Sequence, residues 1–195
     1  MSDPETLGVY DARAAEYAAK FVKDKPGPLL RRFMAALPAG GHVLDLGCGP
    51  GGSAVQLLAN GFTAVGMDAS SEMVAHARAA GVEAIQATYD DLKDVATFDG
   101  VWCNFALLHA PRDAMPDHLA AIHRALKPGG HFHVALKTGT GSARDKIGRL
   151  YTFYSEQELS DLMTAAGFSI LDTSHGEDAG LAGDVEPWIA LLARG

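Results

Sequence analysis

The amino-acid sequence predicts an α/β fold, in which helices cover a mostly parallel β-sheet. Its 195 residues suit one domain with a full hydrophobic core. Short apolar runs alternate with longer helical patterns from residue 42 to residue 138, as strand–helix units of a parallel sheet do. Two apolar runs near the end have no helix-length segment between them, and strands joined by such a loop are expected to pair antiparallel.

The parallel part of the sheet is expected to hold five strands, each bounded by a helix or a turn. The strands are expected at 42–47, 63–70, 82–88, within 98–109, and at 131–138. The helices between them are expected over 52–61, 71–81 and 115–130. Each of these helices ends at glycine or at Pro-Gly, which are typical C-terminal signals.

Segments outside this alternation are expected at both ends of the chain. Two helices, over 11–23 and 26–38, precede the first strand. The glycine-rich stretch 138–148 is interpreted as a mobile loop and not a phosphate-binding loop, because no Gly-Lys-Ser/Thr follows it. A helix over 154–168 opens with a capping box, Ser155 to Glu158, and the antiparallel pair follows at 168–174 and 187–194.

Composition narrows the possible partners and the cellular setting. A net charge of −8 repels nucleic-acid phosphates and anionic membranes, so neither is expected as a partner. Cys48 and Cys103 form no CxxC pair, which argues against a disulfide framework or a zinc ribbon. The first residues lack the apolar segment of a signal peptide, and no apolar run reaches the length of a membrane span. We therefore expect a cytoplasmic protein, whose oligomeric state the sequence does not indicate.

The motif "HVLDLGCGPGGSA", residues 42–54, carries the strongest functional signal. Its glycines have the G-x-G-x-x-G spacing, which suits a dinucleotide or S-adenosylmethionine because both need close approach of the backbone. Asp68, 21 positions after Gly47, fits an acidic residue that binds ribose hydroxyls in either case. Asp45 should face the ligand, where a carboxylate opposes a pyrophosphate and suits a cationic amino acid with a sulfonium group. The alternative is that Asp45 only caps the loop by accepting glycine N–H groups.

Five segments in order resemble the class I S-adenosylmethionine-dependent methyltransferases over about residues 42–137: "VLDLGCGPGGSA", "VGMDAS", "FDGVWCNFALLHAP" and "LKPGG", with "YTFYSEQELSDLMTAAGF" resembling the end of small members. The opening "YDARAAEY" resembles their N-terminal helix, whose tyrosines close over the cofactor. The resemblance implies a Rossmann-like three-layer α/β/α sandwich with a seven-stranded, mostly parallel sheet and an antiparallel last strand. It also implies one methyltransferase domain over 1–195, with cofactor-covering helices in 1–38, a cofactor-binding core in 42–137, and a substrate loop, last helix and strand pair in 138–195.

The resemblance assigns a set of cofactor-binding residues. They are Tyr17, Asp45, Gly47, Cys48, Gly49, Asp68, Ala69, Thr88, Tyr89, Asp90, Asn104 and Phe105. The family often places an acidic residue four positions before a leucine to bind the adenine edge, but the chain has Thr88 there. Either Thr88 and Tyr89 supply this contact, or the register shifts and Asp90 does. Ser70 is expected to flank the adenine, to cap the next helix, or to do both.

His109 is the candidate catalytic residue, because histidine can accept a proton near neutral pH. An alcohol acceptor would need such a base, whereas a thiolate or a deprotonated acid would not; packing in the substrate loop is the alternative role. His131 and His133 share one face of a strand, but no third ligand is evident, so no metal site is expected. Arg144 and Arg149 are read as surface charge, with binding of an anionic substrate group as the alternative.

These observations predict an enzyme that moves a methyl group from S-adenosylmethionine to a small-molecule acceptor by in-line displacement, leaving S-adenosylhomocysteine. Its main contribution would be positioning, which can supply about 7–11 kcal/mol in favourable cases. The Asn/Asp-Pro-Pro-Tyr/Trp motif of enzymes that methylate amino groups of DNA or protein is absent from the sequence. The alternatives are a non-catalytic S-adenosylmethionine-binding module and an NAD(P)-dependent oxidoreductase.

Overall fold

The structure, a computed structural model, describes residues 3–195 and is built around a seven-stranded sheet. The strands are β1 (His42–Leu46), β2 (Thr63–Asp68), β3 (Glu83–Gln86), β4 (Phe98–Asn104), β5 (Leu126–Lys137), β8 (Ser169–Ala179) and β9 (Val185–Arg194). They lie in the order β3-β2-β1-β4-β5-β9-β8. Strands β1 to β5 are parallel, and β9 runs antiparallel to β5 and β8, which confirms the predicted sheet.

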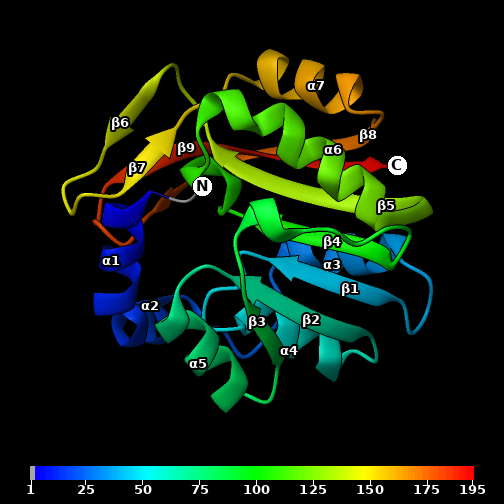
Figure 1. The fold of residues 1–195 in the computed structure, drawn as a ribbon, viewed down its shortest axis with the longest axis horizontal. Coiled ribbons are helices and arrows are strands. Elements are labelled where there is room, and N and C mark those ends of the chain that lie inside the picture. The colour runs from blue at the N-terminus through cyan, green and yellow to red at the C-terminus, as the bar shows by residue number, and fades with distance from the viewer. Residues whose placement is uncertain (1–2) are drawn as a thin grey trace.

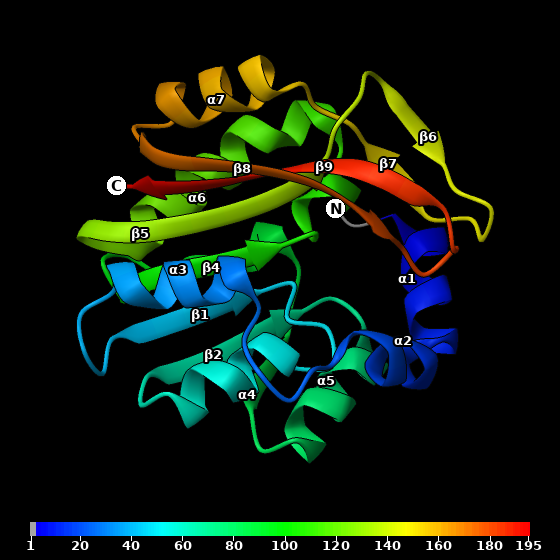
Figure 2. The same ribbon diagram turned by 180° about the vertical axis from the view of Figure 1, so that it is seen from behind.

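Helices on both faces of the sheet make the molecule three layers thick. One face carries α3 (Pro28–Ala36), α4 (Gly52–Ala59) and α5 (Ser71–Ala79), of which α3 and α4 lie in front of the sheet in Figure 2. The opposite face carries α6 (Met115–Ala125) and α7 (Glu156–Ala165), which lie in front in Figure 1. This is the predicted α/β/α sandwich.

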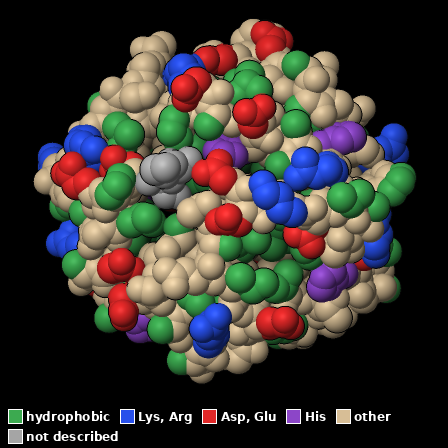
Figure 3. Space-filling view, viewed as in Figure 1, with side chains coloured by type: hydrophobic (Ala, Val, Ile, Leu, Met, Phe, Trp, Pro, Cys, Tyr) green, Lys and Arg blue, Asp and Glu red, His purple; other side chains and the backbone are tan. Residues whose placement is uncertain are grey.

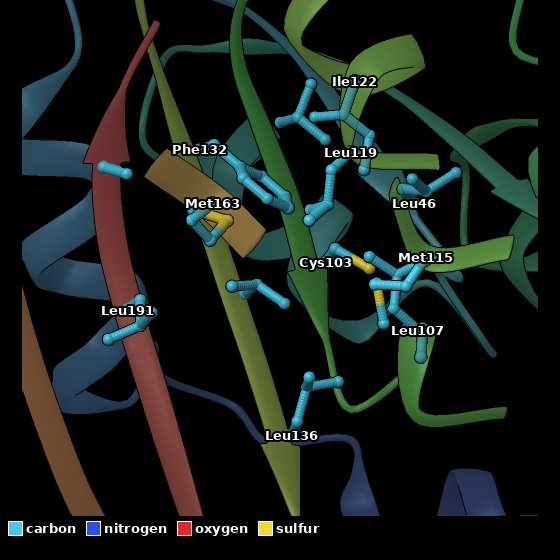
Figure 4. Close-up of a cluster of buried hydrophobic side chains, with 14 of the residues drawn as sticks. Leu46, Cys103, Leu107, Met115, Leu119, Ile122, Phe132, Leu136, Met163 and Leu191 are labelled. Carbon is cyan, nitrogen blue, oxygen red and sulfur yellow. The ribbon is translucent and has the colours of Figure 1, made fainter. Parts of the chain in front are cut away.

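Two clusters of buried apolar side chains join these layers. One packs α6 and α7 against β4, β5 and β9, and Figure 4 shows Leu119, Phe132 and Met163 among its members. The other packs α3, α4 and α5 against β1 and β2, with Phe33 and Leu57 fully buried. Since burial of each large side chain contributes about 1.5–3 kcal/mol, these clusters hold the parallel strands in register and their carboxyl ends at one edge.

The N-terminal segment differs from the single helix that was predicted over 11–23. It forms two helices, α1 (Pro4–Ala12) and α2 (Ala14–Phe21), which meet at the non-helical Arg13. The first helix begins earlier than predicted because Asp3 caps it, accepting the backbone N–H of Thr6 at 2.9 Å, and Pro4 suits the first helical turn.

The third inter-strand helix is shorter than predicted. It ends at Ala125 and not near residue 130, because Leu126 is extended and already pairs with Phe98 of β4. The physical reason is Pro128, which lacks a backbone N–H and disfavours a helical residue before it. Strand β5 therefore begins at Leu126.

The glycine-rich segment that was predicted as a mobile loop over 138–148 forms the first strand and the turn of a hairpin, whose second strand follows it. The strands of the hairpin are β6 (Ser142–Arg144) and β7 (Leu150–Thr152). The Asp145 side chain closes the turn between them, accepting the backbone N–H groups of Ile147 and Arg149 at 3.1 and 2.9 Å. Aspartate side chains often stabilise turns by such local hydrogen bonds, and a prediction based on glycine content does not detect them.

The surface carries charges of both signs side by side. Figure 3 shows acidic and basic side chains interspersed on the face that α6 and α7 cover. Within residues 3–195, no helix has both the length and the apolar character needed to cross a membrane. The division of the chain at residues 38, 42 and 137 into functional segments stays a prediction.

Candidate functional site

A cavity opens at the carboxyl ends of β1, β2 and β4, where parallel sheets commonly bind ligands. It has a volume of about 670 Å³ counted out to its open mouth. Helices α1 and α2 lie beside this edge of the sheet (Figure 1) and add Tyr10 and Tyr17 to the lining. The residues predicted from the sequence that line it are Tyr17, Gly47, Gly49, Asp68, Ala69, Thr88, Tyr89, Asn104, Phe105 and His109.

The glycine loop brings bare backbone to the cavity. Gly47 has φ +74°, and a Cβ built there would lie 2.2 Å from the Cβ of Ala106, so no side chain fits. The backbone N–H groups of Gly47 and Cys48 both bond the carbonyl of Met67, at 2.7 and 3.1 Å, which fastens the loop to the end of β2. The loop therefore offers the close backbone approach that an adenosyl amino acid requires.

Asp68 lies at the end of β2 and holds the loop that follows β1. One carboxylate oxygen accepts the N–H of Gly49 at 2.8 Å, and the other accepts the N–H of Ser70 at 2.9 Å. Burial raises the pKa of this carboxyl, although hydrogen bonds from the backbone of Ser70, Gly49 and Ala69 lower it. Each oxygen keeps a second acceptor position, so a pair of ribose hydroxyls can be accommodated.

Ser70 caps the helix that follows β2. Its hydroxyl oxygen accepts the N–H of Met73 at 3.1 Å and donates to Asp11 of α1 at 2.6 Å. The capping alternative for Ser70 is thus what the structure shows, and the same side chain connects α5 to the N-terminal helix.

Asp45 and Cys48 lie behind the loop and do not line the cavity. The Asp45 side chain is buried, bonds the backbone of Ala54, and leaves Oδ2 without a hydrogen-bond partner among residues 3–195. Burial, with Asp68 nearby, raises the pKa of Asp45 to about 7. Cys48 packs against Gly66 on β2. Their contact with a cofactor stays a prediction.

Of the residues predicted to bind the adenine edge, Thr88 and Tyr89 line the cavity and Asp90 does not. Asp91 fixes this segment by accepting both the backbone N–H and the hydroxyl of Thr88, each at 2.8 Å. The Tyr89 hydroxyl donates to the carbonyl of Ala106 at 2.8 Å. The geometry supports the first of the two predicted registers. The apolar side chains Met67 and Met73, which were not predicted as site residues, complete this wall.

Asn104, at the end of β4, is held by a histidine from the neighbouring strand. His133 Nε2 lies 3.2 Å from Asn104 Oδ1, and its ring stacks on Trp102 at 3.8 Å. Burial lowers the pKa of His133 to about 3, so the ring is neutral and its N–H bonds the amide oxygen. Asn104 therefore presents N–H donors to the cavity beside Phe105, which has φ +56°.

His109 is fixed through both ring nitrogens. Nδ1 lies 2.7 Å from the carbonyl of Leu150, and Nε2 lies 2.8 Å from the hydroxyl of Tyr10. Burial lowers the pKa of His109 to about 4, with the charges of Arg149 and Lys137 acting in the same direction. The imidazole is therefore neutral near pH 7.

Tyr10 and Arg149 are two polar residues at the site that the sequence analysis did not assign to it. Tyr10 lies inside the quoted "YDARAAEY", so the resemblance contained a signal for it. Arg149 was interpreted as surface charge, yet it is 3% exposed and donates to the Tyr10 oxygen at 3.0 Å. No sequence signal indicated this burial, because it depends on the hairpin turn and on Asp145, which pairs with Arg149 at 2.7 Å.

Comparison with known proteins agrees with this geometry. A family model described as a methyltransferase domain matches residues 43–130. Malonyl-[acyl-carrier protein] O-methyltransferase of Enterobacter lignolyticus is 38% identical over 103 residues, covering 50% of this chain and 40% of that protein. Trans-aconitate 2-methyltransferase of Variovorax paradoxus is 40% identical over 107 residues, covering 48% and 38%. The chain spans less than half the length of the curated relatives it matches first.

Solved structures extend the similarity to the whole chain. The 1,6-didemethyltoxoflavin-N1-methyltransferase of Burkholderia thailandensis, solved with S-adenosylhomocysteine, is 26% identical with a TM-score of 0.74. That match covers 100% of this chain and 91% of the other. The [4+2]-cyclase SpnF shares the fold at 20% identity and a TM-score of 0.75, covering 100% and 97%.

Proposed function

Because this chain belongs to the class I S-adenosylmethionine-dependent methyltransferase family, we propose that it transfers a methyl group from S-adenosylmethionine to a small-molecule acceptor. One observation carries the proposal. The glycine loop after β1 and Asp68 at the end of β2 are joined by the bond from Gly49 N–H to the carboxylate, at the edge of one cavity. Backbone amides and an acidic group with acceptor positions to spare suit an adenosyl amino acid.

The residues around the cavity fit the cofactor in three places. Gly47 and Gly49 would leave room for its amino-acid end, Asp68 would accept its ribose hydroxyls, and Tyr89 with Met73 would line the place of its adenine. When bound, S-adenosylmethionine supplies a methyl group on a sulfonium that departs as a neutral thioether. The chain's own contribution is to hold the acceptor in line and to exclude water beneath Tyr10 and Tyr17.

A small acceptor is favoured by the way the cavity is covered. Asp3 and, from helix α1, Thr6 and Leu7 contribute to the lining, so the N-terminal segment covers part of the cavity. The relatives include a trans-aconitate 2-methyltransferase and a 1,6-didemethyltoxoflavin-N1-methyltransferase, but also a malonyl-[acyl-carrier protein] O-methyltransferase. The chain's net charge of −8 is unfavourable for nucleic acid.

The second candidate is an S-adenosylmethionine-binding protein that transfers no methyl group. The specific observation in its favour is the fold shared with a [4+2]-cyclase, because a protein named for another reaction can have this same fold. An NAD(P)-dependent oxidoreductase is disfavoured, since the buried carboxyl of Asp45 stands at the end of β1, beside the loop that would hold a pyrophosphate.

The test is to incubate the protein with S-adenosylmethionine carrying a labelled methyl group and a cell extract separated into small-molecule and macromolecular fractions. We expect label to move into the small-molecule fraction and S-adenosylhomocysteine to accumulate with it. Label in protein or nucleic acid would contradict the small-molecule acceptor. Saturable cofactor binding with no transfer into either fraction would support the binding-protein alternative.

A further inference from the structure

A continuous chain of hydrogen bonds links the covering helix to the hairpin through His109. Arg149 Nη1 donates to the oxygen of Tyr10 at 3.0 Å, and that hydroxyl lies 2.8 Å from His109 Nε2. His109 Nδ1 lies 2.7 Å from the carbonyl of Leu150. Tyr10 and His109 line the cavity, whereas Arg149 is buried behind them with Asp145.

The direction of these bonds follows from the groups themselves. A backbone carbonyl only accepts, so His109 Nδ1 carries the proton, and in the neutral ring Nε2 must then accept from the Tyr10 hydroxyl. Arg149 only donates, so it uses one acceptor position on the Tyr10 oxygen. A hydroxyl oxygen has a second acceptor position, and Tyr10 thus has one for a ligand in the cavity.

We propose that Tyr10 and His109 act as a pair that takes the proton of the acceptor, and that the acceptor reacts through a hydroxyl group. This inference rests on the methyl transfer proposed above. As the acceptor oxygen gains the methyl group, its proton passes to the Tyr10 oxygen, and the Tyr10 proton passes to His109 Nε2. The electron pair of the broken carbon–sulfur bond stays on sulfur, so the positive charge of the sulfonium ends on the imidazole and the total charge is unchanged.

The surroundings of His109 suit a base that releases its proton after each catalytic cycle. Tyr10 on α1, Tyr151 and Arg149 at the hairpin, and Lys137 on β5 face the ring, while Asp145 lies beyond Arg149. The two cations disfavour the imidazolium, so the ring stays unprotonated between turns. A weak base suffices, because an oxygen that has been methylated while still holding its proton is a strong acid. Arg149 also stabilises negative charge that develops on the Tyr10 oxygen.

Methyl acceptors that bind in the ionised form need no general base such as the Tyr10–His109 pair. A thiolate or a carboxylate attacks with a lone pair and has no proton to remove, and a relay that ends on a buried imidazole would serve no step for it. An alcohol or a phenol must lose its proton, and general-base assistance of this kind typically contributes about 10²–10⁴-fold to the rate. The pair therefore separates hydroxyl acceptors from ionised ones.

The first arm of the test needs no turnover. Nitrogen-15 NMR of histidine-labelled protein in complex with S-adenosylhomocysteine should show His109 neutral at pH 7 with its proton on Nδ1. The Nε2 resonance should shift in Tyr10→Phe, which removes the hydroxyl, and stay in place in Tyr154→Phe. Tyr154 is the matched control, because its buried hydroxyl has no hydrogen-bond partner among the described residues and it does not line the cavity. A protonated ring, or a proton on Nε2, would overturn the proposal.

The second arm measures release of S-adenosylhomocysteine with three probes: catechol for hydroxyls, dithiothreitol for thiols and trans-aconitate for carboxylates. We expect turnover of catechol alone, with kcat lowered about 10²-fold or more in Tyr10→Phe and His109→Gln and KM changed little. Tyr154→Phe should stay within twofold of the parent. Turnover of the thiol or the carboxylate would overturn this inference and leave the proposed methyl transfer standing. Catechol turnover within threefold of the parent in Tyr10→Phe would do the same.

Discussion

At the residue scale, the site is distinguished by polar side chains whose hydrogen-bond partners are set by the surrounding fold. Asp68 and Asn104 were predictable, because each follows an apolar strand of a recognisable motif. The burial of Asp45 behind the loop was not, since the sequence places it at the strand end but does not show which way the side chain turns. Its carboxyl lies 2% exposed, with one oxygen lacking a partner among the described residues.

Asp45 gives a prediction for stability as a function of pH. Its folded-state pKa of about 7 lies above the ordinary value of 3.8, so the folded protein holds a proton that the unfolded chain has lost. The contribution is complete below about pH 3.8 and is lost as the pH rises through 7. Asp45→Asn should therefore raise the free energy of unfolding by about 2–4 kcal/mol at pH 8, and the gain should vanish toward pH 4.

Urea unfolding of both proteins across this range provides the measurement. Asp24→Asn, which makes the same change at an exposed aspartate, is the matched control and should follow the parent at every pH. A gain that is the same at pH 4 and pH 8 would show that the carboxyl of Asp45 does not titrate in this way.

At the element scale, the covering helix and the hairpin form one connected unit over the cavity. Thr6 on α1 accepts the backbone N–H of Leu150 on β7 at 2.9 Å, and Arg144 on β6 pairs with Asp3 at 2.9 Å. The sequence predicted the strands of the sheet and the helices between them from periodicity, but it missed this hairpin and the start of α1 at Pro4. Both depend on hydrogen bonds that the backbone donates to the side chains of Asp145 and Asp3. Such bonds produce no periodic pattern of apolar residues in the sequence.

Thr6→Val tests this connection. The substitution keeps the shape of a buried side chain and removes the acceptor of the Leu150 N–H, which costs about 1–3 kcal/mol when a buried donor is left unpaired. We expect faster hydrogen exchange in residues 4–21 and 142–152, by about tenfold, with the central strands unchanged. Arg13→Ala removes an exposed ion pair with Glu16 and should leave exchange close to the parent rate. Equal exchange in Thr6→Val and the parent would mean that the helix is held elsewhere.

At the scale of the whole molecule, the order of the strands places the site. Strand β1 lies between β2 and β4, so the loops after these three strands meet at one edge, and the N-terminal helices close over them. The strand count, the parallel set and the antiparallel last strand followed from the sequence because alternation and connection length determine them. The contacts of Tyr10 with His109 join residues 99 positions apart, and no local pattern encodes such a contact.

The buried histidines predict acid sensitivity of the whole fold. Burial lowers the pKa of His133 to about 3, so below its ordinary value of 6.5 the unfolded chain takes a proton that the folded protein refuses. This contribution to stability is complete above pH 6.5 and is lost as the pH falls. At pH 5 the loss amounts to about 2 kcal/mol relative to pH 7. His133→Gln should lack this part of the decline in urea unfolding, while the exposed His175→Gln should retain it. Identical declines in the two variants would contradict a neutral, buried His133.

The most direct test of the central claim, that the cavity between β1 and β2 binds S-adenosylmethionine, is calorimetric titration of this cofactor and of NADH. The parent protein should bind S-adenosylmethionine and give no signal with NADH. Asp68→Asn should weaken the binding at least about tenfold, because hydrogen bonds to a charged group contribute about 1.5–3 kcal/mol. Asp24→Asn should bind like the parent. Binding of NADH, or S-adenosylmethionine binding that is equal in Asp68→Asn and the parent, would contradict the account.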